Sequence, residues 1–534
     1  MFRRLLHPLL ILALGATACS TDNAADDPVR NVVDARSYYD RYSSPEMEDM
    51  SAPAGTPNLN AATVAAERST GVIAPPVEPE WPDPDEDNVF VDVGDSAWTT
   101  VDDDRESTFG LDVDTGSFMV GRAQLDAGSL PERDSIRIEE WVNAFDLTEV
   151  EPSGDDALGV EIEVAAAPHT DDGTRLVRIG IGTAELAAED RPAANITFVI
   201  DTSGSMDIRD RLGLVQSSLA LLVNTLRADD TIAIVTYGDD ATALLPPTPI
   251  SEATDIVDAI DSLVPAGSTD MESGLRLGYE MAREGFRTDA LNVVVLASDG
   301  VANMGSTDPQ VLIDDIAQAG DEGISLVTVG YGMGNYNDHL MEQLADRGDG
   351  FYRYLNTFED AETLFVEDFS ATLTIVAGDA KSQVVFDDGV VEAYRLIGYE
   401  NRALDDSEFR DDTVDAGELG AGHEVTALYE VRLLDAEAHE TPLGEVRLRW
   451  TVPGTGETVE RETSIPAAVT EASPSLRLAA VVAGVAEVLR GDEVVIERGL
   501  TLASLAEDAD VLVADGVAQA EEIAAVIDAA RAID

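Results

Sequence analysis

The sequence predicts an α/β fold: a doubly wound, mostly parallel sheet inserted in a β-sandwich, with C-terminal helices. Between residues 191 and 375, short apolar runs alternate with helical patterns, as in a parallel sheet covered by helices on both faces. After residue 375 the pattern changes to the apolar–polar alternation of antiparallel strands. Two similar runs precede the parallel region, at 158–182, and two strands alone form no stable sheet in water. We therefore expect both flanks to build one sandwich around the insertion.

The composition argues against a nucleic acid partner. The 534 residues suffice for about two to four domains. With 33 basic and 105 acidic residues, the formal net charge is −72, whereas phosphate binding needs clustered lysine and arginine. An acidic surface attracts cations diffusely, so only a shaped group of ligands indicates a specific cation site.

Residues 1–19 have the features of a lipoprotein signal peptide. Arg3 and Arg4 form a positive n-region, and the apolar run Leu5 to Leu14 is too short to span a bilayer as a stable helix. The following Ala16-Thr17-Ala18-Cys19 resembles a bacterial lipobox, which implies acylation of Cys19 and anchoring in the cell membrane or outer membrane, facing the periplasm or the exterior. An ordinary secretory signal with an incidental cysteine remains the alternative. Because Cys19 is the only cysteine, no internal disulfide is expected.

Residues 20–88 are predicted to form a mostly disordered tether. The stretch is polar and acidic, shows no helical or strand periodicity, and ends in a run with five prolines, at 75, 76, 79, 82 and 84. Such a segment would hold the folded part of the chain away from a membrane.

Residues 89–157 are expected to form an N-terminal module. A strand is predicted at 89–93, and an amphipathic helix at 136–145 carries Ile138, Trp141, Val142 and Phe145 at spacings of three and four. Residues 158–190 then hold two strands of the composite sandwich, joined by the turn signal Asp171-Asp172-Gly173.

The parallel region is assigned residues 191–375, and the last region residues 376–534. In the parallel region, strands are predicted at 195–200, 231–237, 291–297, 324–329 and 350–354, with an edge strand near 241–245. Its helices are expected at 212–226, 271–284, 309–319, 338–347 and 358–366. In the last region, strands are predicted around 384–386, 394–397, 427–431 and 446–450, and helices at 474–490, 500–507 and 517–533.

The sequence Asp201-Thr202-Ser203-Gly204-Ser205-Met206 directly follows the first predicted parallel strand. It places a carboxylate and two hydroxyls at the carboxyl edge of the sheet, where open α/β sheets bind ligands. These oxygens are hard donors that suit Mg²⁺ or Mn²⁺. Two further loops, Gly267-Ser268-Thr269-Asp270 and Ala297-Ser298-Asp299-Gly300, are expected at the same edge.

Together the three loops resemble the metal-ion-dependent adhesion site of the von Willebrand factor type A (VWA) family. The resemblance implies direct coordination by Ser203 and Ser205, coordination by Thr269 directly or through water, and water-mediated roles for Asp201 and Asp299. It also implies a Mg²⁺ or Mn²⁺ cofactor and a protein partner that offers a Glu or Asp carboxylate to the ion. The alternative, a turn in which Asp201 only caps a helix, is disfavoured by the other two loops.

A wider resemblance covers residues 89–534. The segments Asp112-Val113-Asp114-Thr115, Arg137-Ile138-Glu139-Glu140 and Tyr394 to Arg402 are similar to a family of bacterial envelope VWA lipoproteins. That family has a VWA-associated N-terminal segment and a C-terminal domain of poorly known function.

The sequence favours a binding protein over an enzyme. Asp114-Thr115-Gly116-Ser117 imitates an aspartic-protease loop, but that chemistry needs a second carboxylate loop, and 114–117 is read as a turn. The histidines have no paired zinc spacing, and the glycine-rich stretch 330–334 lacks the lysine of a phosphate-binding loop, so no nucleotide is expected. Two rival hypotheses remain: an envelope enzyme or enzyme accessory with unrecognised hydrolytic activity in the C-terminal region, and a scaffold with a purely structural metal.

Overall fold

The computed structural model describes residues 33–42 and most of residues 90–533. Gaps fall at 91–93, 95, 112, 148–149, 151, 155, 171, 187–189, 266, 301–308, 333–337, 369–373, 413, 415, 436–440, 468 and 470. The predicted signal peptide with Cys19, most of the predicted tether and most of the predicted strand at 89–93 lie outside the described residues. No helix in the described parts of the chain is both long and apolar enough to cross a membrane.

The inserted domain, residues 191–375, contains the predicted parallel sheet. Its strand order is β10-β9-β8-β5-β6-β7. The strands span Ala193–Asp201 (β5), Thr231–Tyr237 (β6), Ala241–Pro249 (β7), Ala290–Ser298 (β8), Ser325–Tyr331 (β9) and Tyr352–Leu355 (β10). All neighbours pair in parallel except the edge strand β7, which is antiparallel to β6. The prediction of five parallel strands and one edge strand is confirmed.

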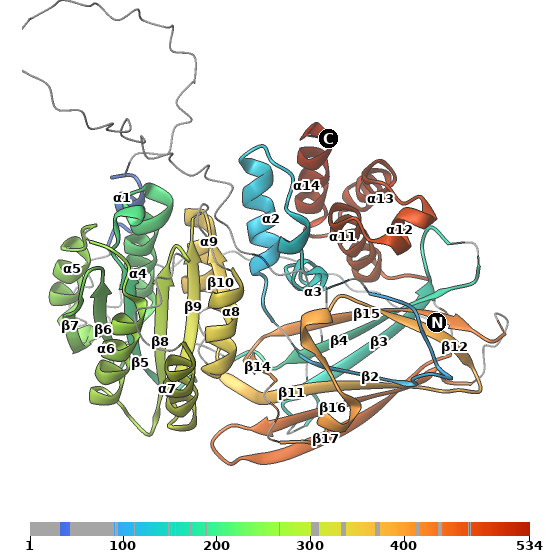
Figure 1. The fold of residues 1–534 in the computed structure, drawn as a ribbon, viewed down its shortest axis with the longest axis horizontal. Coiled ribbons are helices and arrows are strands. Elements are labelled where there is room, and N and C mark those ends of the chain that lie inside the picture. The colour runs from blue at the N-terminus through green and yellow to red at the C-terminus, as the bar shows by residue number, and fades with distance from the viewer. Residues whose placement is uncertain are drawn as a thin grey trace, which may run out of the picture.

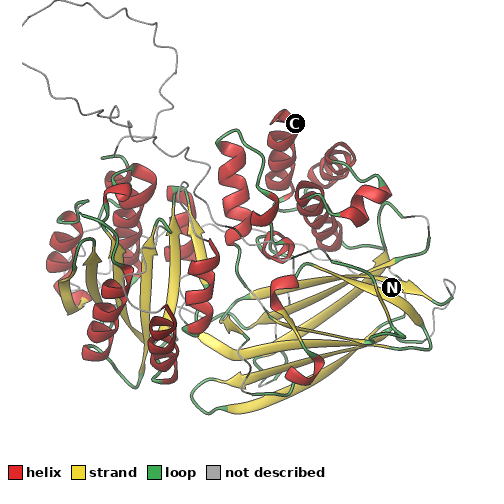
Figure 2. Cartoon of the chain, in the orientation of Figure 1, coloured by secondary structure: helices red, strands yellow, loops and turns green. Residues whose placement is uncertain are grey.

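Helices cover both faces of this sheet (Figure 2). Successive residues of β5 point to opposite faces: Phe198 and Ile200 belong to one apolar core and Val199 to another. The first core includes residues of α4 (Leu214–Thr225), α5 (Ala253–Asp261) and α9 (Phe358–Glu362). The second includes residues of α6 (Met271–Glu284), α7 (Pro309–Asp321) and α8 (Asp338–Arg347). Of these helices, α5 was not predicted.

Two antiparallel sheets form the sandwich, which lies beside the inserted domain (Figure 1). The first has the order β1 (Thr99–Thr100), β12 (Val391–Ile397), β15 (Glu424–Leu433), β4 (Arg175–Thr183) and β3 (Leu158–Ala166). The second has the order β13 (Ala403–Leu404), β2 (Glu106–Gly110), β11 (Ile375–Phe386), β16 (Gly444–Val452) and β17 (Glu457–Ile465), with β14 (Gly417–Gly420) paired to β11.

The pairing of β4 with β15 confirms that the sandwich is built from both flanks of the insertion. It also takes strands from the residues assigned to a separate N-terminal module, since β1 pairs with β12 and β2 with β11. The chain leaves the sandwich after Thr183 and re-enters it at Ile375, and the turn 420–423 is hydrogen-bonded beside both points. The amide of Thr183 donates to the carbonyl of His423 at 3.0 Å, and the amide of Ala421 donates to the carbonyl of Thr374 at 2.8 Å.

Six helices pack on the outer face of the first sheet: α2 (Gly116–Asp126), α3 (Ile138–Asn143), α11 (Pro474–Arg490), α12 (Glu493–Arg498), α13 (Leu502–Asp515) and α14 (Ala520–Ile533) (Figure 1). All of them except α12 contribute to an apolar core with Ile397 and Leu428 of that sheet. The predicted helix 474–490 is confirmed. The predicted turn at 114–117 is instead the point where α2 begins, at Gly116.

Residues 33–42, which the sequence assigned to the disordered tether, instead contain a short helix, α1 (Arg36–Tyr39), on the inserted domain. Tyr38 is 2% exposed, and the backbone of Val33 exchanges two hydrogen bonds with the Asn224 side chain of α4. The hydroxyl of Ser217 donates to the carbonyl of Ala35 at 2.9 Å. Tyrosines at 38, 39 and 42 give this decapeptide enough apolar area to dock. The prediction of disorder rested on the average composition of residues 20–88, which is polar and acidic.

Candidate metal centre

The first loop of the candidate site is shaped by Asp201, the last residue of β5. Its carboxylate is fully buried, and Oδ1 accepts a hydrogen bond from the amide of Ser203 at 2.8 Å. This contact turns the chain sharply at the end of the strand. The turn brings the hydroxyls of Ser203 and Ser205 within 2.9 Å of each other. Gly204 between them is exposed, so the loop faces solvent.

The second and third loops meet the first through hydrogen bonds. The amide of Gly204 donates to the carbonyl of Gly267 at 3.3 Å, which joins the first loop to the one that carries Thr269. At Gly267, φ is +85°, and a Cβ would lie 2.7 Å from the amide nitrogen of Asp239, so this close approach requires glycine. The hydroxyl of Ser298, next to Asp299, donates to Oδ2 of Asp201 at 3.2 Å.

All five predicted site residues therefore lie at one sheet edge, as the sequence predicted, with Asp201 at the end of β5 and the other four in the loops. Four of them, Asp201, Ser203, Thr269 and Asp299, are at most 7% exposed. Burial raises the pKa of Asp201 to about 6, and the nearby carboxylate of Asp299 adds to the rise. Because these two buried carboxylates repel each other, a cation bound between them would stabilise the site.

Sequence reasoning missed Arg211, which lies in a turn of π-helix at Arg209–Gly213. Its Nη1 donates to Oδ2 of Asp299 at 2.6 Å and to the carbonyl oxygen of Ser205 at 2.9 Å. The two side chains of this ion pair are 88 residues apart in sequence, so no local pattern joins them. Ser298 was also given no role, although it stands in the predicted third loop.

The donors at this edge fit a hard cation. In the described chain no cluster of three or more His, Cys, Asp or Glu side chains is arranged to hold a metal ion. The candidate site instead offers two carboxylates and the hydroxyls of Ser203, Ser205 and Thr269, an all-oxygen set that suits Mg²⁺ or Mn²⁺ and not a soft metal. The positive charge of Arg211 lies within the same group.

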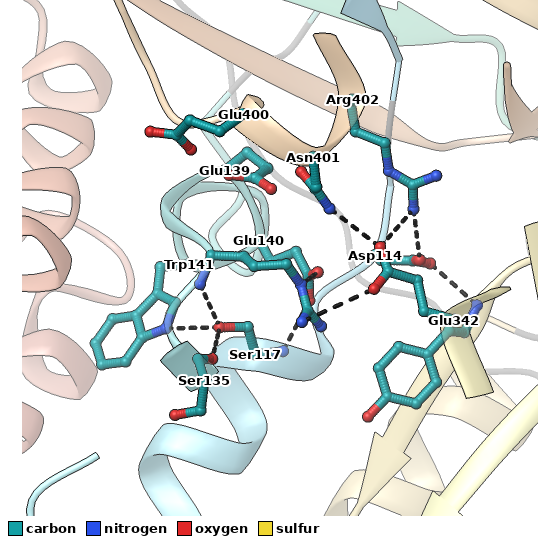
Figure 3. A network of polar contacts seen from close by, with 12 residues as sticks. Asp114, Ser117, Ser135, Glu139, Glu140, Trp141, Glu342, Glu400, Asn401 and Arg402 are labelled. Atoms are coloured by element: carbon teal, nitrogen blue, oxygen red, sulfur yellow. Dashed lines mark hydrogen bonds and ion pairs between the residues drawn. The ribbon is translucent and has the colours of Figure 1, made fainter. Parts of the chain in front are cut away.

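A second polar cluster, which we call the junction network, lies where the inserted domain, the helices and the sandwich meet (Figure 3). Nη2 of Arg402 lies 3.4 Å from Oδ2 of Asp114 and 3.1 Å from Oε1 of Glu342 on α8. Nearby, the amide of Ser117 donates to Oε2 of Glu140 at 2.7 Å. Asp114 is held by the guanidinium of Arg402 and by the amide of Tyr352, which donates to its Oδ1 at 3.0 Å. Asp114 thus serves to join the parts of the molecule.

The junction network gathers segments that the sequence analysis had singled out. Asp114, Glu140 and Arg402 come one each from the three motif stretches of the wider resemblance. Their role in the structure is to fasten the inserted domain to its surroundings, which sequence spacing alone could not reveal.

Three family models match successive parts of the chain. The model described as "von Willebrand factor" matches residues 84–178, "von Willebrand factor type A domain" matches 195–367, and "Uncharacterized protein YfbK, C-terminal" matches 371–533. The second match covers the inserted domain with its metal-site loops, which is therefore a VWA domain.

Among solved structures, a von Willebrand factor type A protein from Catenulispora acidiphila is 18% identical, with a TM-score of 0.39, and the match covers 72% of this chain and 88% of that one. The VWA2 paralog of ArnB from Sulfolobus acidocaldarius is 14% identical, with a TM-score of 0.35 and coverage of 71% and 98%.

Curated relatives include "Uncharacterized protein sll0103" of Synechocystis, 23% identical over 289 residues, 53% of this chain and 68% of that protein. Human inter-alpha-trypsin inhibitor heavy chain H3 is 28% identical over 179 residues, 32% of this chain and 20% of that protein. "Uncharacterized protein YfbK" of Escherichia coli (strain K12) is 38% identical over 411 residues, 72% of this chain and 71% of that protein. With a VWA domain followed by a YfbK-type C-terminal region, the chain belongs to the family of Escherichia coli YfbK.

Proposed function

We propose that this protein is a lipid-anchored cell-envelope binding protein whose VWA domain uses Mg²⁺ or Mn²⁺ to bind an acidic group of a protein partner. The observation that carries the proposal is the meeting of three oxygen-bearing loops at one sheet edge, joined by the Ser298–Asp201 and Gly204–Gly267 hydrogen bonds. The ion would be held by Asp201, Ser203, Ser205, Thr269 and Asp299. VWA domains generally serve protein–protein interaction, which agrees with this assignment.

The charges at the site favour an acidic ligand. Asp201, Asp299 and Arg211 together carry one net negative charge, so a divalent ion would leave one net positive charge. On a chain of net charge −72, such a local positive site would be a rare point of attraction for a carboxylate. A bound cation supplies an open coordination position for a carboxylate oxygen. The exposed Gly204, between Ser203 and Ser205, leaves this side of the loop open for that ligand to approach.

We assign binding and not catalysis to this protein. In the C-terminal region, His423 would be the obvious candidate for proton transfer in the rival hydrolase hypothesis. Its Nδ1 accepts a hydrogen bond from the amide of Gly420 at 2.9 Å, and the residue is 8% exposed. Burial lowers the pKa of His423 to about 3, which keeps the ring neutral and suits a structural role.

The partner-binding proposal is tested with wild-type protein and the variant Asp201→Ala on envelope extracts, in Mg²⁺ and in EDTA. We expect one partner to be retained by the wild type in Mg²⁺ alone, and its retention to be lost when its contacting Glu or Asp is changed to the amide. A partner held equally in EDTA, or equally by Asp201→Ala, contradicts the proposal.

The lipid anchor is a separate prediction. Cys19→Ser should move the protein from the membrane fraction to the soluble fraction, because acylation of Cys19 is the proposed means of attachment. The measurement is fractionation followed by a high-salt wash, which removes charge-bound protein. A Cys19→Ser variant that stays in the washed membranes contradicts anchoring through this residue.

A further inference from the structure

We infer that Arg211 is a built-in counter-ion of the metal centre, which pairs with Asp299, links two loops of the site and weakens cation binding. This inference rests on the proposed function, because it concerns the same site. It adds a residue of opposite charge to the five that the VWA resemblance supplies, and it assigns that residue a role in setting the affinity.

The geometry places the guanidinium between two loops of the site. Nη1 of Arg211 donates to Oδ2 of Asp299, in the third loop, and to the carbonyl oxygen of Ser205, in the first loop. The Arg211 side chain is 8% exposed and that of Asp299 is fully buried, so water screens this ion pair little. One side chain therefore links the first and third loops of the metal site.

The fold keeps a path open for this side chain. Gly332, directly after β9, has φ of +71°, and a Cβ at this position would lie 2.7 Å from Cγ of Arg211. Glycine thus serves two needs at once, the left-handed backbone and the close approach of the arginine. This accounts for one glycine of the glycine-rich stretch at 330–334.

The charges at the site account for both proposed effects of Arg211, on the loops and on cation affinity. Asp201 and Asp299 are buried and repel each other, so without a cation the pair would be destabilising. Arg211 offsets that repulsion. A divalent ion at the same oxygens must either loosen the Arg211–Asp299 pair or stay close to a positive guanidinium, and both lower its affinity. The site would then fill only at high cation concentration, while its loops stay assembled when it is empty.

The test compares wild type with Arg211→Met, and with Arg211→Gln as a second variant that keeps a hydrogen-bond donor but not the charge. Calorimetric titration with Mg²⁺ should show binding roughly tenfold or more tighter in both variants. Thermal unfolding should show that the Tm of either variant falls in EDTA and recovers in Mg²⁺, whereas the wild-type Tm changes little.

The matched control is Arg209→Met, in the same helical turn. Arg209 pairs with Asp210 and lies over the ring of Tyr39, so its loss removes the same charge from the protein but leaves the Arg211–Asp299 pair in place. We expect wild-type Mg²⁺ affinity and Tm response from this control.

The outcomes separate this inference from the proposed function. If the wild type binds Mg²⁺ and the Arg211 variants bind it equally or more weakly, Arg211 only supports the loop and the inference is overturned alone. The same holds if the Tm of the variants shows no dependence on Mg²⁺. If no protein in the series shows saturable binding, the proposed function fails and the inference fails with it.

Discussion

His423 lies at the turn where the VWA domain joins the sandwich, and its neutral ring is part of that turn. Nδ1 accepts from the Gly420 amide, an acceptor role that a protonated ring cannot fill. Burial, and to a lesser extent the charge of Arg353, lowers the pKa of His423 from 6.5 to about 3. Between these two values the unfolded chain binds a proton that the folded chain does not. This residue therefore makes the folded state less stable as pH falls from 6.5 towards 3.

His423→Asn should remove that part of the pH dependence, because asparagine keeps an acceptor oxygen but does not titrate. From about pH 6 to about pH 4, the wild type should lose about 2 kcal/mol more unfolding free energy than the variant. Urea unfolding of the wild type and of the variant at a series of pH values measures this difference in unfolding free energy. Parallel pH profiles of the two proteins would show that His423 is protonated normally in the fold.

Single residues also show what the sequence could reveal about the site. The five oxygen-bearing residues are recognisable because each stands in a short loop after a strand or before a helix. Arg211 and Ser298 are not, since their roles depend on contacts with Asp299 and Asp201 at separations of 88 and 97 residues. Such contacts exist only after the sheet has formed.

At the scale of elements, α1 departs furthest from the prediction, which placed these residues in a disordered tether. Tyr38 is 2% exposed, and its burial against the VWA domain raises its pKa to about 12, with a further contribution from Asp261. The Tyr39 hydroxyl donates to Oδ1 of Asp210 at 3.3 Å, and Arg209 lies over the Tyr39 ring. This segment thus supports the helical turn that carries Arg211.

Tyr38→Ala should destabilise the VWA domain by about 3 kcal/mol, because it removes a buried aromatic side chain. Urea unfolding followed by circular dichroism measures the change. Arg36→Ala in the same helix is the control: its ion pair with Glu359 joins two side chains that are more than half exposed, and its loss should have little effect. Equal effects of the two substitutions would mean that α1 is not docked in solution.

The predictions of secondary structure were right where runs of apolar residues determine the element and wrong where tertiary packing determines it. The parallel strands were predicted because most of their residues are apolar. Helix α2 was missed because residues 114–117, which include Gly116, were interpreted as a turn. In the fold, a Cβ at Gly116 would lie 2.1 Å from the Tyr352 ring, and one at Gly121 would lie 2.6 Å from the Trp141 ring. These glycines allow close packing inside a helix, which a local pattern cannot distinguish from a turn.

For the whole molecule, the junction network should make the VWA domain and the sandwich unfold together. Arg402 bridges Asp114 and Glu342, and both carboxylates are buried. Arg402→Met leaves them without this cation and should cost on the order of 3 kcal/mol. Differential scanning calorimetry should show one transition for the wild type and two for the variant.

Arg410→Met is the control for this prediction, because Arg410 forms an exposed pair with Glu460 on the sandwich alone. It should keep the single transition. Two transitions in the wild type would show that the junction network does not couple the two bodies.

The central claim, a specific divalent cation site in the VWA domain, is tested most directly by calorimetric titration with Mg²⁺. Enough salt is needed to suppress diffuse binding to the acidic surface. The wild type should bind one ion, and Asp201→Ala and Ser203→Ala should lose this binding while remaining folded. Asp207→Ala, which removes an exposed carboxylate from the same edge, should bind as the wild type does. Equal affinity in the wild type and Asp201→Ala would contradict the claim.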